Sequence, residues 1–236
     1  MNLILLEKFD FIDDDLVQIQ GRRLDHLKTV TKVKAGDTLV CGQLNGKMGT
    51  GIVCQIADDH CRIKVTLDSD PPLPLPLTLV LALPRPKYTR RIIQAATSLG
   101  VKQIYLINSW RVEKSFWKSP VISPDSLHQQ MILGLEQSRD TMLPVVHFKR
   151  FFRQFVEQDL PEISKNSVCI TAHPKTDRLC PMAIDQPVTL IVGPEGGFID
   201  IEIQTLEKYG FNSYHIGSRI LKVETAVPYL ISRLYS

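Results

Sequence analysis

The sequence predicts an α/β protein in two parts, a small β-rich domain followed by a larger domain in which strands and helices alternate. The boundary rests on segment 68–77, where four prolines fall within six residues and exclude a helix or a central strand. Before this segment the pattern is one of short strands with a hairpin signal, and after it apolar strands alternate with helical stretches. With 236 residues, 44% of them hydrophobic, the chain can build a packed core.

The first part is expected to form a small β-barrel. Asn45-Gly46 is a two-residue hairpin signal between strands. A helix over 23–33 would plug or flank the barrel with Leu24, Leu27, Val30 and Thr31 on one face. The expected strands cover 38–44, 51–56 and 61–67.

In the second part, strands are expected over 77–83, 101–107, 145–148, 168–171, 189–192 and 214–216. Helices are expected over 87–99, 124–137, 150–158, 200–209 and 222–235. In the first of these helices Ile92, Ala95, Ala96 and Leu99 would face inward, and Gly100 would end it. The alternation predicts a sheet with helices packed on it.

Composition excludes several classes of protein. No apolar run approaches the roughly 20 residues of a membrane-spanning helix, and the first residues lack the basic leader of a signal peptide, so a cytoplasmic location is expected. The five cysteines form no Cys-x-x-Cys pair and the six histidines show no ligand spacing, so neither a disulfide framework nor a metal site is expected. A net charge of +3 is too small to prove a nucleic-acid partner by itself.

Two glycine-rich segments near the end of the chain carry the strongest functional signal. An apolar strand runs into Gly193-Pro194-Glu195-Gly196-Gly197, and a second strand ends close to Gly217. Glycine loops after neighbouring strands are where open α/β sheets bind nucleotide-like ligands. The first loop matches neither a Walker loop nor Gly-x-Gly-x-x-Gly, so on spacing alone an ordinary tight turn is an equal alternative.

These segments, 191–198 and 216–226, resemble the hallmark pair of the SPOUT superfamily of RNA methyltransferases, and within it the 16S ribosomal RNA uracil-N3 methyltransferase (RsmE) family. Weaker likeness extends to the motifs at 85–87, 94, 99–101, 136–139 and 173–174. The resemblance implies a PUA-like RNA-binding β-barrel over 1–70 and a SPOUT methyltransferase domain over 71–236, whose tail is threaded as a deep trefoil knot.

The resemblance also implies that three loops of the knot bind S-adenosyl-L-methionine without a metal. Glycine backbone groups would contact the adenine edge while apolar side chains pack on its face. The implied cofactor-binding residues are Thr171, Ala172, His173, Pro174, Val192, Gly193, Pro194, Glu195, Gly196, Gly197, Ile216, Gly217, Ser218, Ile220, Leu221, Glu224, Thr225 and Ala226.

The implied reaction is methyl transfer to N3 of one uridine in 16S ribosomal RNA. The uracil N–H is weakly acidic, so a cation must stabilise charge on the flanking carbonyl oxygens. Arg219 and Arg139 are candidates for that cation, and Glu136 or a water for relaying the proton. Expected contacts to RNA phosphates are Arg22, Arg23, Arg85, Lys87, Arg90, Arg91, Arg111 and Lys114.

Partners follow from the same resemblance, namely 16S ribosomal RNA in an assembled small subunit and a second copy of the chain. An apolar stripe on the last helix, formed by Val223, Val227, Leu230, Ile231 and Leu234, is the expected homodimer surface. Two alternatives stay open at this point. The protein could bind ribosomal RNA without catalysis, or the same fold could methylate another RNA.

Overall fold

The computed structural model describes residues 2–235. The chain divides into two compact units. The first extends to Leu73 and also includes Ile132–Leu143, and the second contains Pro74–Met131 and everything from Pro144 onward. The sequence had placed 132–143 in the second domain, so this segment differs from the expected division.

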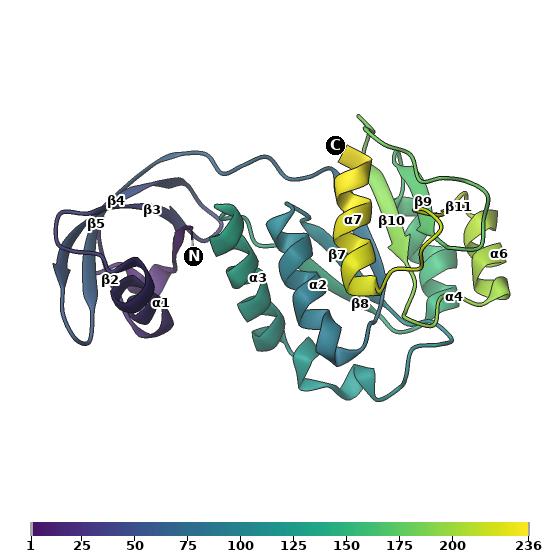
Figure 1. The fold of residues 1–236 in the computed structure, drawn as a ribbon, viewed down its shortest axis with the longest axis horizontal. Coiled ribbons are helices and arrows are strands. Elements are labelled where there is room, and N and C mark those ends of the chain that lie inside the picture. Colours follow the sequence, from purple (N-terminus) through teal and green to yellow (C-terminus); the bar gives the residue numbers. More distant parts are fainter. Residues whose placement is uncertain (1, 236) are drawn as a thin grey trace. The chain divides into compact units, whose positions relative to one another are not determined.

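The first unit is built on a five-stranded sheet with the order β1-β3-β4-β5-β2 (Figure 1). The short β1 runs parallel to β3, and the other neighbours are antiparallel. The two edge strands, β1 and β2, were not among the expected strands. The strands are β1 (Ile4–Leu6), β2 (Leu16–Ile19), β3 (Thr38–Gln43), β4 (Met48–Ile56) and β5 (Cys61–Ser69).

The helix of the first unit is shorter than its apolar periodicity predicts. Helix α1 (Gly21–His26) passes into a π turn over Leu27–Thr31, which is wider than an α turn and shifts the facing of the residues that follow. Leu24 and Leu27 are buried as expected, but Val30 is 66% exposed, so the predicted position of Val30 on the buried face is wrong.

Residues 132–143 complete the first unit through apolar and polar contacts. Leu135 is fully buried in a cluster with Leu3 and Leu5. The Thr141 hydroxyl donates to the Gly46 carbonyl at 2.6 Å. Because Leu135 belongs to helix α3 (Pro124–Ser138), the last turns of this helix serve the first unit rather than the sheet of the second.

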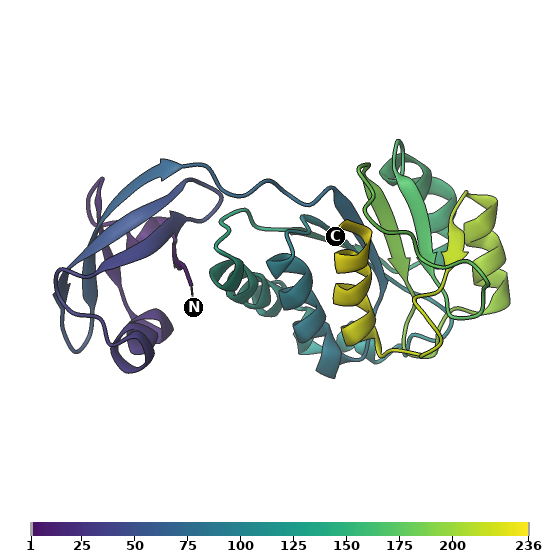
Figure 2. The same ribbon diagram turned by 45° about the horizontal axis from the view of Figure 1, so that its top comes forward.

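The second unit contains a parallel sheet of six strands with the order β11-β9-β10-β6-β7-β8 (Figure 2). The central strands are almost wholly apolar, as expected of strands covered on both faces. In both views α2 and α7 lie on one side of this sheet and α6 on the other, which makes a layered α/β unit. The strands are β6 (Leu77–Ala82), β7 (Gln103–Ile107), β8 (Val145–Lys149), β9 (Val168–Ala172), β10 (Val188–Val192) and β11 (Asn212–Tyr214).

The helices of this unit follow the sequence pattern with local differences. In α2 (Pro86–Ser98), Ile92 and Ala96 are buried as expected, whereas Leu99 follows the helix end and is 37% exposed. The single helix expected over 150–158 is divided into α4 (Phe152–Gln154), a π turn over Phe155–Asp159 and α5 (Leu160–Ile163). The remaining helices are α6 (Asp200–Lys208) and α7 (Val223–Tyr235).

The apolar stripe on α7 is used inside the chain. All five of its residues are buried, and α7 packs directly on α2. The stripe is therefore core, and the expectation that it forms the surface for a second copy of the chain is wrong. Among residues 2–235, no helix has the length and apolarity to cross a membrane.

Candidate cofactor pocket and its surroundings

A pocket of about 430 Å³ lies at the carboxyl ends of β9, β10 and β11. This is the edge of an open parallel sheet at which ligands are commonly bound. Three segments form its wall, each directly after a strand, and the amino-terminal half of α7 adds apolar side chains. The lining residues are Ala172–Lys175, Val192–Gly197, Tyr214–Gly217, Arg219–Val223, Ala226 and Leu230.

The loop after β10 needs glycine for steric reasons. A Cβ atom on Gly193 would lie 3.1 Å from a ring carbon of Phe198, whose side chain is only 4% exposed. Gly197 adopts a φ of 71°, and its N–H donates to the Pro194 carbonyl at 2.7 Å to close a turn. The loop is therefore a fixed turn that brings main-chain atoms to the pocket.

The segment after β11 is held by the loop that follows β9. The His215 N–H donates to the Arg178 carbonyl at 2.8 Å, and the His215 carbonyl accepts from the Cys180 N–H at the same distance. Gly217, with a φ of 126°, donates its N–H to Nδ1 of His215 at 3.1 Å. Strand β11 covers Asn212–Tyr214, whereas the sequence pattern predicts a strand over 214–216, and His215 forms a single parallel bridge with Leu179 beyond the strand end.

Buried polar atoms next to the pocket have no partner within the described chain. They are Oγ1 of Thr171, which is fully buried beside Ala172, and Oε2 of Glu224, beside Val223. A buried polar atom without a hydrogen bond is costly, and such atoms mark places where a ligand or water completes the network.

In the pocket wall, burial lowers the pKa of His173, which favours the neutral imidazole.

The structure brings together most of the residues that the sequence associated with the cofactor. Thr171, Ser218, Glu224 and Thr225 do not line the pocket, and all the other predicted residues do. Lys175, Tyr214, His215, Lys222, Val223 and Leu230 line it without having been predicted. All but Leu230 lie within two residues of a predicted position, and Leu230 follows Ala226 by four residues, which is one helical turn on the same face.

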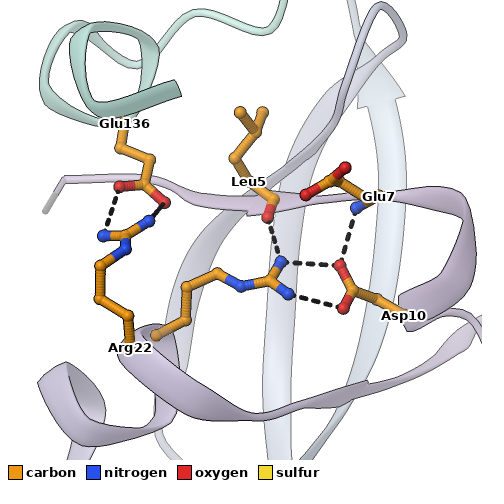
Figure 3. Close-up of polar contacts among 6 residues, drawn as sticks. Leu5, Glu7, Asp10, Arg22 and Glu136 are labelled. Carbon is orange, nitrogen blue, oxygen red and sulfur yellow. Dashed lines mark hydrogen bonds and ion pairs between the residues drawn. The ribbon is translucent and has the colours of Figure 1, made fainter. Parts of the chain in front are cut away.

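The predicted catalytic residues are separated. Arg219 lines the pocket and is exposed, and its guanidinium makes no hydrogen bond or ion pair within residues 2–235. Neither Arg139 nor Glu136 is among the lining residues. Glu136 is 2% exposed, and its two carboxylate oxygens accept from the two terminal nitrogens of Arg22 at 2.7 and 2.9 Å (Figure 3). That carboxylate is thus occupied by a structural ion pair of the first unit.

Two predicted RNA contacts, Arg22 and Arg23, instead pair with buried carboxylates of the first unit. Arg22 holds Glu136, and Arg23 donates to both oxygens of Asp10 at 2.7 Å and to the Leu5 carbonyl at 2.6 Å. Asp10 is 3% exposed and also accepts the Glu7 N–H at 2.7 Å, as Figure 3 shows. The guanidinium of Arg23 is therefore not available to a phosphate, because burial of Asp10 requires it as a partner.

The remaining predicted RNA contacts are exposed and lie in the second unit. They are Arg85, Lys87, Arg90, Arg91, Arg111 and Lys114. Two of them touch the pocket loop. The Arg85 N–H donates to Oε1 of Glu195 at 2.9 Å, and Nη1 of Arg111 donates to the Gly196 carbonyl. The side chain of Arg111 and the backbone of Arg85 thus stand beside the turn that lines the pocket.

Comparison with known proteins agrees with this arrangement. Ribosomal RNA small subunit methyltransferase E of Treponema pallidum is 28% identical over 233 residues, covering 96% of this chain and 87% of the relative. Ribosomal RNA small subunit methyltransferase E 1 of Borreliella burgdorferi is 24% identical over 226 residues, covering 96% of this chain and 94% of the relative.

Solved structures show the same fold. Ribosomal RNA small subunit methyltransferase E from Neisseria gonorrhoeae, bound to S-adenosyl methionine, has a TM-score of 0.70 with 21% identity, covering 98% of this chain and 96% of that one. A putative methyltransferase from Legionella pneumophila with bound cofactor SAM has a TM-score of 0.74 with 20% identity, covering 98% and 95%. The RNA methyltransferase domain family matches residues 71–235. Because that match spans more than half of the sequence, the chain belongs to the RNA methyltransferase family.

Proposed function

We propose that this protein is an S-adenosyl-L-methionine-dependent methyltransferase that forms 3-methyluridine in 16S ribosomal RNA. One observation carries the proposal. A pocket bounded by glycine turns and apolar side chains lies at the carboxyl edge of the sheet, within the part of the chain that matches the RNA methyltransferase family. The names of the relatives give the small-subunit RNA as the substrate to test first.

The residues of the pocket fit this cofactor. Its volume of about 430 Å³ suits a molecule of nucleoside size. Main-chain groups of the 193–197 turn can pair with an adenine edge, Leu221 and Leu230 can pack on the ring, and the unpartnered oxygens of Thr171 and Glu224 lie beside the wall. S-adenosyl-L-methionine supplies an electrophilic methyl group on a sulfonium when it is bound.

Arg219 is the residue of the pocket best suited to assist the reaction. N3 of uracil loses its proton as it gains the methyl group, so negative charge spreads to the carbonyl oxygens O2 and O4. Arg219 lines the pocket, and its cationic donors have no partner among residues 2–235. A guanidinium placed there stabilises the developing charge and lowers the cost of deprotonation. Arg111, whose guanidinium contacts the pocket loop, and the exposed Arg85, whose backbone N–H contacts it, would hold the phosphates.

The finer features of the fold belong to the same proposal. We infer a threaded tail, as in SPOUT proteins, in which segment 178–184 crosses the path of the last residues. The paired hydrogen bonds between His215 and the 178–180 segment support this, as do the Ile184 N–H to the Leu234 carbonyl at 2.7 Å and Nε of Arg233 to the Cys180 carbonyl at 2.8 Å. The first unit would be the PUA-like RNA-binding part.

The proposal includes a homodimer and an assembled small subunit as partners. The buried stripe of α7 is excluded as the dimer surface, whereas the exposed side of the same helix, with Tyr229 44% exposed, is open to a second copy. A ribosomal substrate would place the reaction in the cytoplasm. Sedimentation of the free protein and of its mixture with small subunits tests both partners.

The central experiment combines calorimetry with mass spectrometry. Titration with S-adenosyl-L-methionine should give a saturable heat, and 16S RNA from cells that lack the protein should lose one 3-methyluridine. Arg219→Ala should keep cofactor binding and lose methyl transfer, while Arg153→Ala, which removes an exposed arginine on α4, should change neither. Absence of cofactor binding would favour the RNA-binding alternative, and a methyl group lost from another RNA would favour the second alternative.

A further inference from the structure

A turn directly after β7 presents an exposed tryptophan on a rigid support. Trp110 is 79% exposed, although its neighbours Ser109 and Val112 are buried at 3% and 7%. The Val112 N–H donates to the Ser109 carbonyl at 3.1 Å and closes the turn. The Trp110 N–H donates to Oε1 of Glu202, whose side chain is 6% exposed, at 2.8 Å. The backbone that carries the indole is therefore fixed.

This turn is attached to the loop that lines the pocket. The other oxygen of Glu202 accepts the Ile199 N–H at 3.0 Å, so one buried carboxylate joins Trp110 to the residues that follow the glycine turn. Arg111, next to Trp110, donates to the Gly196 carbonyl, and a Cβ atom on Gly196 would lie 2.9 Å from Cδ of Arg111. The backbone of Trp110 is thus tied to the loop that lines the pocket, and its exposed indole extends from that backbone.

The end of the neighbouring strand adds a second exposed ring and another cation. Strands β7 and β8 end level with each other, because Ile107 pairs with Lys149 and the Asn108 N–H donates to the Lys149 carbonyl at 3.0 Å. Phe151, two residues after Lys149, is 71% exposed. The guanidinium of Arg150 lies 5.4 Å from the centre of the Trp117 ring. We call Trp110, Arg111, Lys114, Arg150 and Phe151 the β7–β8 rim.

The chemistry of the rim fits single-stranded RNA. Each of its two exposed rings is next to a cation in the sequence, and rings with cations are the combination that stacks on bases while it neutralises phosphates. A protein partner would favour an apolar patch without interleaved charge at its centre. Glu113 is the acidic residue of segment 110–118, and it leaves the rim with a positive balance.

We propose that the β7–β8 rim binds the single-stranded RNA next to the methylated uridine, with Trp110 stacking on one of its bases. The inference rests on the proposed function, since it names how the same active site holds its substrate. An extruded uridine leaves neighbouring bases unstacked, and an exposed indole on a turn bonded to the pocket loop gives one of them a new stacking partner. Trp110 is then a positioning residue for the substrate.

The test measures affinity for a short single-stranded RNA that contains a central uridine. Trp110→Phe keeps a stacking ring, whereas Trp110→Leu keeps an apolar side chain without one. We expect Trp110→Leu to weaken binding by roughly 5- to 100-fold and Trp110→Phe to weaken it much less. Val145→Ala is the matched control, because Val145 is a 48% exposed apolar residue at the opposite end of β8. It should leave RNA affinity unchanged.

Two further readouts separate stacking from a general loss of structure. The chain has two tryptophans, so in a Trp117→Phe background the RNA should quench the fluorescence of Trp110. Trp110→Leu should leave the salt dependence of binding unchanged, while Arg150→Ala should reduce its log–log slope by about 0.7. Equal affinity of the Leu variant and the unaltered protein, or no quenching, overturns the proposal. Calorimetry with S-adenosyl-L-methionine on each variant tests the proposed function separately, since the cofactor pocket does not include Trp110.

Discussion

The ion pair between Glu136 and Arg22 gives a direct test of structure against catalysis. Glu136 was a candidate for relaying a proton, yet its carboxylate is 2% exposed and both oxygens accept from Arg22. We expect Arg22→Ala and Glu136→Gln to destabilise the first unit, because the first leaves the buried carboxylate without its partner and the second sets an amide N–H₂ donor against the guanidinium donors. Methyl transfer by the folded fraction should continue.

The magnitude follows from the exposure of the two side chains. Breaking a fully buried ion pair by removing one partner costs about 3–5 kcal/mol. The Arg22 side chain is 46% exposed, so water can reach the carboxylate after its removal and part of the cost is recovered. We therefore expect Arg22→Ala to lower the free energy of opening of the first unit by about 1–3 kcal/mol. Replacing both residues by leucine should restore much of the lost free energy of opening, since an apolar pair of similar volume needs no charged partner.

Hydrogen exchange followed by mass spectrometry localises the effect. Peptides from residues 2–73 and 132–143 should exchange faster in Arg22→Ala, and peptides from β9 and β10 should not change. Single-turnover methylation measured on the same samples separates activity from folding. If Glu136→Gln abolished methyl transfer while exchange in the first unit stayed at the unaltered rate, the structural explanation would be refuted and Glu136 would return as a catalytic residue.

Two glycines of the pocket loop should differ in their tolerance of a methyl group, measured by thermal unfolding. Gly193→Ala should cost about 1–3 kcal/mol because the new Cβ atom meets the buried ring of Phe198 at 3.1 Å. Gly196→Ala should cost less than about 1 kcal/mol, since it meets the exposed side chain of Arg111 at 2.9 Å and displaces it, and RNA affinity should fall instead. Burial lowers the pKa of His173, so the folded state resists protonation and loses stability as the pH falls below about 6.5, the ordinary histidine pKa. His173→Asn should remove part of the drop in unfolding temperature between pH 7.5 and 5.5, and only part, because two other histidines also have a lowered pKa.

The elements of the larger unit could be predicted from the sequence because the apolar pattern of each segment matches its burial in the folded unit. Strand β10 has four apolar residues and Thr189, all buried, and the helix after the proline-rich segment begins with Pro86 in its first turn. The first unit was harder. Strand β1 is three residues long, too short for a periodic signal, and the π turn at 27–31 breaks the helical period that placed Val30 inward.

The site was predictable where backbone geometry demands a residue type, and not where long-range pairing decides. Gly193 and Gly197 are fixed by a close approach and a positive φ, so their spacing in the sequence already describes the turn. No local rule indicates that Arg22 pairs with a carboxylate 114 residues away, because the residues next to an arginine in the sequence do not show which distant side chain it contacts. Arg85 and Arg111 follow the ends of β6 and β7, two neighbouring parallel strands, and both contact the pocket loop, so the topology and not the charge pattern brings them to it. The position of a basic residue at the carboxyl edge of the sheet is therefore a better guide to RNA contact than its position in the sequence.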